Sequence, residues 1–134
     1  MQEMFLHNAF CCVKIMDVVF FIISTFYGAR RDPFRVVFLH EQEKVMQIAQ
    51  SVVGGRIPML LGLGGNNTAA IIDRISNTDL SAWDGLLIVT PYYNKCSQKG
   101  LYQHYMQIAD NVNIPIILYN IPGRTGVTIE IPTI

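Results

Sequence analysis

The feature that most constrains the fold is a regular alternation of short apolar runs with longer segments that have helical periodicity. Apolar runs begin at Ile57, Leu86 and Ile116, so their spacing is about thirty residues. Between the runs, apolar residues recur every three or four positions, which is typical of amphipathic helices. Short runs that are apolar throughout are typical of strands buried on both faces of a parallel sheet. The sequence therefore predicts an α/β domain in which strands and helices alternate.

Each predicted helix has a recognisable start or end. The first should begin near Glu41 and stop at Gly54 and Gly55, because glycine ends helices readily. The second should be capped by Asn67 or Thr68, and the third by Ser97. The expected apolar faces of these helices are, in order, Val45, Ile48, Ala49, Val52 and Val53; Ile71, Ile72 and Ile75; and Leu101, Tyr105, Ile108, Ala109 and Val112.

The strands are expected at residues 57–61, 86–90 and 116–119, with one further strand within residues 18–23. Their spacing is close to the ~31 residues per unit that result when ~250 residues form eight strand and helix units of a barrel. A doubly wound open sheet has a similar rhythm, so periodicity alone leaves both architectures open. Residues 1–40 otherwise lack this order.

Composition narrows the range of partners. The chain is 51% hydrophobic, and its 10 basic and 10 acidic residues cancel, so nothing indicates a nucleic acid or an anionic membrane as partner. The apolar residues 18–26 are far fewer than the ~20 needed to span a bilayer. Cys11, Cys12 and Cys96 fit neither a disulfide framework nor metal-site spacing. A reduced, cytosolic protein without a metal or cofactor is expected.

In parallel β/α proteins, reactive groups gather where strands end. The first such segment, GLGGNN at residues 62–67, lacks the third glycine of a dinucleotide site and the lysine of a P-loop. It is either a close-packed turn around a substrate or a purely structural turn. The second, TPYYN, places the phenols of Tyr92 and Tyr93 after the rigid Pro91, although simple packing of both rings is the alternative.

The third segment, YNIPGRTG, combines a phenol with a guanidinium on a glycine-bracketed loop. Arg124 can hold a carboxylate through two parallel hydrogen bonds, and the glycines beside it let a ligand approach the backbone. Tyr119 can transfer a proton only if neighbours bring its phenol into play, since an unperturbed phenol has a pKa near ~10. The pattern predicts carboxylate chemistry, with an ordinary surface arginine as the alternative.

Three segments, GRIPMLLGLGGNNT, DGLLIVTPYYNKCSQKGLYQHY and NIPIILYNIPGRTG, resemble in order and spacing the dihydrodipicolinate synthase group of the N-acetylneuraminate lyase family of Schiff-base aldolases. The resemblance covers about residues 41–134. It implies a partial (β/α)8 TIM barrel, roughly the units around strands 3 to 5, in a cytosolic homotetramer. It also implies a lyase that condenses pyruvate with L-aspartate 4-semialdehyde through a lysine Schiff base, in lysine and diaminopimelate biosynthesis.

The resemblance further implies roles for individual residues. Tyr119 matches the proton donor and acceptor beside the Schiff base, and Tyr93 matches the relay phenol that is reached across the dimer interface. Arg124 matches the residue that receives the semialdehyde's carboxylate, while Tyr92 has no catalytic assignment. Another pyruvate-dependent aldolase, similar to N-acetylneuraminate lyase, is the alternative; GRTG favours the synthase, whose smaller aldehyde carries a carboxylate for Arg124.

Two departures from the family pattern shape the expectations. The family's Schiff-base lysine lies on the strand after YNIPGRTG, beyond Ile134, so this chain alone is expected to be inactive, or a catalytically dead fragment. The family's threonine pair is absent, and GARRDPFRVVFLH at residues 28–40 stands in its place. The abrupt change at Glu41 suggests a displaced reading frame or a wrongly joined gene model upstream of it, and translation of the source DNA in its other frames should reveal the threonine motif. Open sheet edges should make the chain self-associate.

Overall fold

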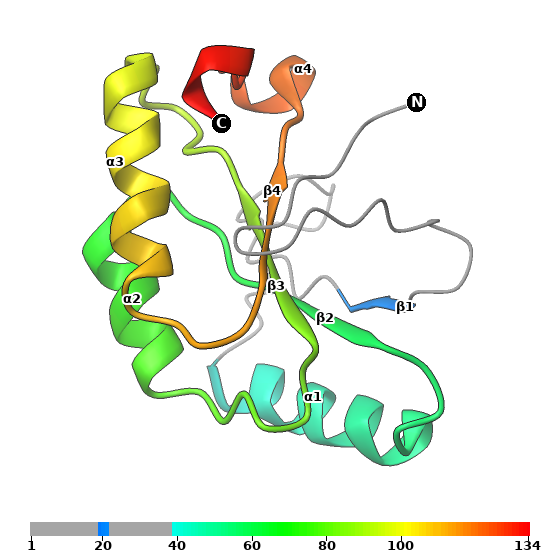
Figure 1. Ribbon diagram of the computed structural model, residues 1–134. Helices are drawn as coiled ribbons and strands as arrows, with labels where there is room; N and C mark the ends of the chain where they lie inside the picture. The colour runs from blue at the N-terminus through cyan, green and yellow to red at the C-terminus, as the bar shows by residue number, and fades with distance from the viewer. Residues whose placement is uncertain (1–18, 22–38) are drawn as a thin grey trace, which may run out of the picture.

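The computed structural model describes residues 19–21 and 39–134, with side chains from residue 42 onward. Four parallel strands form one sheet in the order β1-β2-β3-β4, and helices follow β2, β3 and β4 (Figure 1). The elements are β1 Val19–Phe21, α1 Leu39–Val53, β2 Met59–Gly62, α2 Thr68–Ser76, β3 Gly85–Val89, α3 Gln98–Ala109, β4 Ile116–Tyr119, α4 Pro122–Thr125 and the 3-10 turn η2 Ile131–Thr133.

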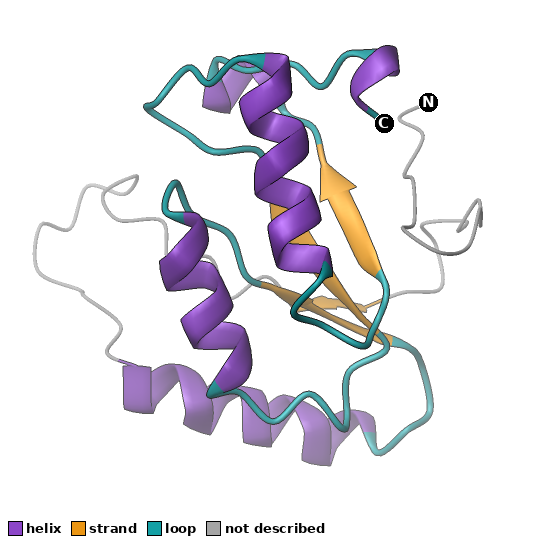
Figure 2. Cartoon of the chain, turned by 60° about the vertical axis from the view of Figure 1, so that its left-hand side comes forward, coloured by secondary structure: helices purple, strands orange, loops and turns teal. Residues whose placement is uncertain are grey.

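Every strand pairs with the strand next to it along the chain. Leu60 lies opposite Gly85, Leu86 opposite Ile116, and the register of β3 with β4 continues to the pair Val89 and Tyr119. α1, α2 and α3 gather on one side of the sheet (Figure 2). Strands in unreversed chain order with helices on one face are the arrangement of a β/α barrel, which confirms the predicted barrel units among the described strands.

The two faces of the sheet carry different side chains, because alternate residues of a strand point in opposite directions. The face toward the helices forms the larger core, made with helix residues, of Met59, Leu61, Leu86, Ile88, Ile116, Ile71, Ile75, Leu101 and Ile108 among others. The opposite face carries a small cluster of Leu60, Leu87 and Ile117, with Tyr119 packed against it. The prediction of strands buried on both faces is confirmed for β2 and β3, whereas the last two residues of β4 are half-buried.

The helix boundaries follow local chemistry, as the sequence predicts. The Asn67 side chain accepts a hydrogen bond from the amide of Ala70 over 3.2 Å, and Ser97 accepts one from Gly100 over the same distance. α1 ends before Gly54, whose φ of +54° is easily adopted by glycine. β2 begins at Met59, two residues later than predicted, and α3 ends before Val112, which still packs against the core.

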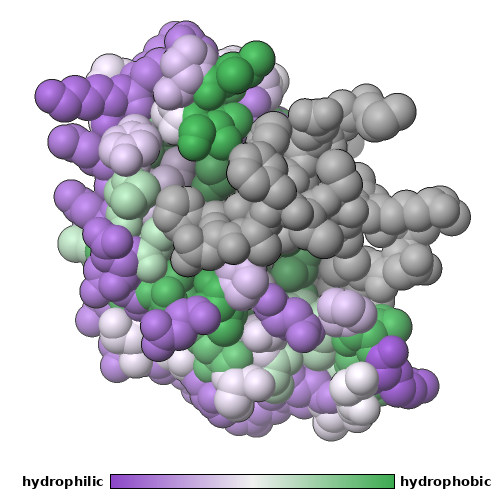
Figure 3. All heavy atoms as spheres, viewed as in Figure 1, coloured by the Kyte–Doolittle hydropathy of each residue, from purple (hydrophilic) through white to green (hydrophobic). Residues whose placement is uncertain are grey.

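The predicted apolar face of α1 is partly wrong. Ala49 and Val53 are buried as expected, together with Gln42, but the stripe of Val45, Ile48 and Val52 is 40%, 62% and 64% exposed. The amide of Gln42 is hydrogen-bonded by Arg74 of α2, so a polar side chain can face inward without losing its hydrogen bond. Hydrophobic surface is visible near the end of α1 and beside the C-terminal turn (Figure 3).

The N-terminal predictions are tested only at β1. β1 is a strand within residues 18–23, as predicted. Cys11, Cys12, Lys14 and residues 22–38 lie outside the part of the chain that is described. Within the described part, no helix is both long and apolar enough to cross a membrane.

Candidate functional site

The carboxyl ends of β3 and β4 bring two predicted site segments together. The backbone amide of Thr90, which follows β3, donates a hydrogen bond to the carbonyl oxygen of Tyr119, the last residue of β4, over 3.2 Å. The loop with Tyr93 and the loop with Arg124 therefore start from adjacent points. α4 and the beginning of α3 lie at this same end of the sheet (Figure 1).

Tyr119 lies on the sheet face turned away from the helices. Its ring packs against the cluster of Leu60, Leu87 and Ile117, and the residue is half-buried. In a closed barrel this face is the interior, and its upper layer borders the site at the carboxyl end. The structure thus gives Tyr119 apolar surroundings at a strand end, which is where an inward-facing phenol can serve proton transfer.

Arg124 lies on the short helix α4, five residues after Tyr119. Its backbone amide bonds to the carbonyl of Ile121 over 3.0 Å, whereas its side chain is exposed. Among residues 42–134 no hydrogen bond or ion pair occupies its guanidinium. The expected glycine-bracketed loop is thus a short helix at this point, and an arginine with open hydrogen-bond donors beside a strand end can receive a carboxylate.

Tyr93 sits on a strained backbone. It has a φ of +66°, and among the described residues it is the one that adopts a positive φ without being a glycine. The amide of Asn94 bonds to the carbonyl of Tyr92 over 2.9 Å, so Tyr93 is the middle residue of a three-residue turn, a rare and strained arrangement. Strain of this kind gathers at functional positions.

The two adjacent phenols, Tyr92 and Tyr93, have different environments. Tyr92 is half-buried, whereas Tyr93 is 85% exposed. Their rings meet edge to face, with centroids 5.7 Å apart and an angle of 73°. Tyr93 is thus presented outward and is supported at its edge by its neighbour.

The glycine-rich turn after β2 has a clear packing role. A Cβ atom on Gly64 would lie 2.5 Å from Cγ1 of Val89, so no larger residue fits beside the end of β3. The amide of Leu63 continues the sheet by bonding to the carbonyl of Leu87 over 3.2 Å. The turn is close-packed, as predicted, and its packing partner is β3; a role in holding substrate stays a prediction.

Sequence reasoning missed three polar residues near the site. Asn120 Oδ1 accepts a hydrogen bond from the amide of Ile129 over 3.2 Å. The hydroxyl of Thr125 lies 3.1 Å from the carbonyl oxygens of both Ile121 and Val127. Thr90 is fully buried, and its hydroxyl has no hydrogen-bond partner among the described residues. Their place after strands was a usable signal, but their contacts join residues that sequence reasoning could not bring together.

Other buried titratable groups lie in the helix layer. The hydroxyl of Tyr105 bonds to the carbonyl of Ile88 over 3.3 Å, and burial, followed by the nearby Cys96, raises the pKa of Tyr105. The Nδ1 atom of His104 lies 2.8 Å from the hydroxyl of Thr68, and burial lowers the pKa of His104. Tyr105 belongs to the larger core, and neither residue is part of the cluster that packs against Tyr119.

No described residue fits the role of a reactive amine or of a metal centre. Lys44, Lys95 and Lys99 are all exposed, so no desolvation activates them. Within the described residues, no group of three or more His, Cys, Asp or Glu side chains is placed to hold a metal ion. Cys96 is a free, half-buried thiol that packs against the core.

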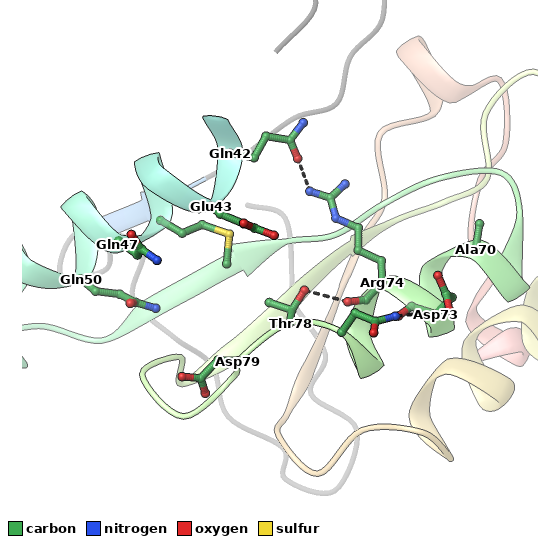
Figure 4. A pocket seen from close by; sticks show the side chains of 11 residues that line it. Gln42, Glu43, Gln47, Gln50, Ala70, Asp73, Arg74, Thr78 and Asp79 are labelled. Atoms are coloured by element: carbon green, nitrogen blue, oxygen red, sulfur yellow. Dashed lines mark hydrogen bonds between the residues drawn. The ribbon is translucent and has the colours of Figure 1, made fainter. Parts of the chain in front are cut away.

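A cavity of about 650 Å³ lies between α1 and α2 and away from the candidate site. Most of the residues that line it are polar, among them Gln47, Gln50 and Asp73 (Figure 4). Arg74 crosses toward Gln42 at one end, and burial lowers the pKa of Arg74. Neither Tyr119 nor Arg124 borders this space.

Comparison with known proteins places this arrangement among related enzymes. The model of the dihydrodipicolinate synthetase family matches residues 34–134. A curated 4-hydroxy-tetrahydrodipicolinate synthase of Ligilactobacillus salivarius is 50% identical over 99 residues, which are 72% of this chain and 34% of the relative. The synthase of Cytophaga hutchinsonii is 47% identical over 93 residues, 69% of this chain and 31% of that protein.

Solved structures agree with this match. Dihydrodipicolinate synthase from Thermotoga maritima superposes with a TM-score of 0.68 at 40% identity, covering 73% of this chain and 33% of that structure. The chloride-inhibited synthase from Acinetobacter baumannii, solved with pyruvate, has a TM-score of 0.61 at 46% identity, covering 68% of this chain and 32% of that one. The chain spans about a third of the length of the relatives that it matches.

Proposed function

Because the chain belongs to the dihydrodipicolinate synthetase family, we propose that residues 57–126 supply the tyrosine and arginine part of a lyase site. In the complete barrel this site condenses pyruvate with L-aspartate 4-semialdehyde, a step toward diaminopimelate and lysine. The observation that carries the proposal is the pairing on one segment of Tyr119, set against an apolar sheet face, with the exposed and unpaired Arg124.

The proposed chemistry assigns each group one task. A lysine Schiff base with pyruvate loses a proton to form an enamine, whose carbon attacks the aldehyde of the second substrate. The phenol of Tyr119 carries protons to and from the reacting atoms in a water-poor pocket. Arg124 holds the carboxylate of the semialdehyde and so orients its aldehyde toward the enamine.

The nucleophile belongs to another part of the barrel in this proposal. Lys44, Lys95 and Lys99 are exposed, whereas a Schiff-base lysine is made reactive by desolvation. Residues 42–134 therefore supply no nucleophile in this proposal, and we expect the chain by itself to be inactive. Treating it with pyruvate and borohydride should give no covalent adduct, whereas an adduct on one of these lysines would contradict this assignment.

Tyr93 acts in a second subunit in this proposal. Tyr93 is 85% exposed on a backbone held at a positive φ, so its phenol is accessible to a neighbouring subunit. Such a residue can complete a proton relay across an interface. We accordingly propose a cytoplasmic homo-oligomer, a tetramer as in the family; the solved relatives also include a monomeric synthase variant, so the assembly is to be measured.

A chimeric barrel tests the function directly. Residues 42–134 replace the aligned segment of the Ligilactobacillus salivarius relative, which keeps its own Schiff-base lysine; this protein is called the chimera below. Borohydride trapping of pyruvate checks that the chimera folds and forms the Schiff base. Turnover of the semialdehyde should then follow. A chimera that traps pyruvate but does not turn over the semialdehyde would refute the proposal. Turnover of N-acetylneuraminate instead would support the alternative of an aldolase similar to N-acetylneuraminate lyase.

A further inference from the structure

The side chain of Gln98 ties the start of α3 to the segment that follows Arg124. Its Nε2 donates to the carbonyl of Thr128 over 2.8 Å. Its Oε1 accepts from the amide of Glu130 over 3.2 Å and from the hydroxyl of Thr133 over 2.6 Å. Donor and acceptor ends of one amide are thus used on residues at least 30 positions away along the chain.

Gln98 holds the end of a closed loop that has Arg124 near its middle, together with the residues that directly follow this loop. Asn120 Oδ1 accepts from the amide of Ile129 over 3.2 Å, which closes residues 120–129 at their base. Val127 and Ile129 anchor the loop in the core beneath α3. Asn120 therefore closes the loop, and Gln98 fixes it from outside.

The same loop also approaches the Tyr93 loop. A Cβ atom on Gly126 would lie 3.7 Å from Cε of Lys95, two residues after Tyr93. The start of α3, η2 and α4 lie at one end of the molecule in both ribbon views (Figures 1 and 2). Gln98 is the first residue of α3, so it directly follows the loop with Tyr93 and bonds to the loop with Arg124.

We propose that Gln98 is a positioning residue that sets where Arg124 stands relative to the loop of Tyr93. Arg124 is exposed and unpaired, so contacts of its own side chain do not hold it, and its position depends on the backbone of its loop. A displacement of about 1 Å in a substrate-positioning group can cost up to on the order of a hundredfold in kcat/KM for the substrate that it holds. The catalytic meaning of this proposal rests on the proposed function; the structural coupling does not.

Hydrogen exchange of the 134-residue chain tests the coupling alone. In Gln98→Ala, the peptide that covers residues 127–134 should exchange roughly tenfold faster, because the amide of Glu130 loses its acceptor. Peptides from β2 and α2 should be unchanged. Gln103→Ala, the same substitution on the exposed side of α3, should leave all peptides unchanged. Equal protection in Gln98→Ala and Gln103→Ala would overturn the proposal.

Kinetics of the chimera test the positioning role. Gln98→Ala should raise KM for the semialdehyde roughly tenfold or more, while KM for pyruvate and kcat at saturation stay within about twofold. Gln98→Glu keeps an acceptor for the amide of Glu130 and the hydroxyl of Thr133. Its KM for the semialdehyde should therefore lie between those of Gln98→Ala and the unmodified chimera. A fall in kcat with both KM values unchanged, or equal loss in Gln98→Ala and Gln98→Glu, would refute positioning.

The outcomes distinguish a failure of the Gln98 proposal from a failure of the proposed function. If the unmodified chimera has no synthase activity, the proposed function fails, while hydrogen exchange still decides whether Gln98 holds the loop. If the unmodified chimera is active and Gln98→Ala behaves like Gln103→Ala in both measurements, the proposed function stands and the Gln98 proposal falls.

Discussion

The amide of Thr90 donates a hydrogen bond to the carbonyl oxygen of Tyr119 at the point where β3 and β4 end. This pairing fixes the main chain of Tyr119 independently of its phenol. Removing only the hydroxyl should therefore leave the strand ends in place and affect chemistry alone.

Tyr119→Phe in the chimera should lower kcat by roughly 10²- to 10⁴-fold, since proton transfer by a placed side chain contributes about that much. Steady-state kinetics and a thermal melt measure the two effects. Tyr102→Phe, an exposed residue of α3, is the matched control and should change neither. A drop of less than about threefold in Tyr119→Phe would exclude the phenol from proton transfer.

Arg124→Lys in the chimera should raise KM for the semialdehyde by on the order of ten- to a hundredfold. The ammonium group of lysine is a point charge and cannot form the two parallel hydrogen bonds that a guanidinium donates to a carboxylate. Pyruvate does not use Arg124 in the proposed site, so its KM is the internal control. An equal rise in both KM values would show that the substitution disturbs the whole site instead.

Gly64→Ala should destabilise the chain by about 1–3 kcal/mol, the usual cost of overpacking, because its Cβ would lie 2.5 Å from Val89. Urea unfolding measures the difference. Gly123→Ala has open space around its Cβ and should cost far less. Adding Val89→Ala to Gly64→Ala should recover part of the loss; no recovery would mean that another contact is responsible.

Stability should fall as the pH drops below about 6.5, in part through His104. Burial lowers the pKa of His104 in the folded chain, so the unfolded chain binds a proton first as the pH falls. The contribution of His104 to the free energy of unfolding is fully present above the pKa of the unfolded chain, near ~6.5. It is lost as the pH falls toward the lower pKa of the folded chain. Urea midpoints at pH 5.5 and 7.5 should differ less in His104→Gln than in the unmodified chain; an unchanged difference would assign the effect to other groups.

The exposed stripe of α1 should promote self-association. Ile48→Lys and Val52→Lys remove apolar surface that is 62% and 64% exposed, and should shift the chain toward smaller species in analytical ultracentrifugation. Gln47→Lys adds the same charge at an exposed polar position of α1 and is the control. If all three variants sediment alike, charge rather than the apolar stripe governs association.

Much of the fold could be predicted because its signals are local. Asn67 and Ser97 cap the helices that follow them, and β4 has the predicted bounds, since an apolar run between turn residues has few alternatives. The inward face of α1 could not be predicted. Which side of a broadly apolar helix is buried depends on partners such as Arg74, which lies 32 residues from Gln42.

The positions of the candidate residues were predictable, whereas their supporting contacts were not, and their roles in a site stay predictions. The place of Tyr119 at a strand end follows from the strand pattern, and the place of Arg124 shortly after that strand follows from the sequence. The strained turn at Tyr93 depends on the backbone angle φ, which cannot be predicted from the presence of a tyrosine. The bonds of Gln98 join residues at least 30 positions apart, beyond the reach of any local pattern.

The unreversed strand order also bears on how the chain acquires its structure during synthesis. Each new strand pairs with the strand before it, as in the pairings of Val19 with Met59, Leu60 with Gly85 and Leu86 with Ile116. Short loops close at low entropic cost, and contacts between near neighbours form quickly. The sheet can therefore grow one strand at a time, in the order in which the ribosome releases the chain. If synthesis pauses after any unit, every strand made so far is already paired with its neighbour, and only the last strand waits for a partner.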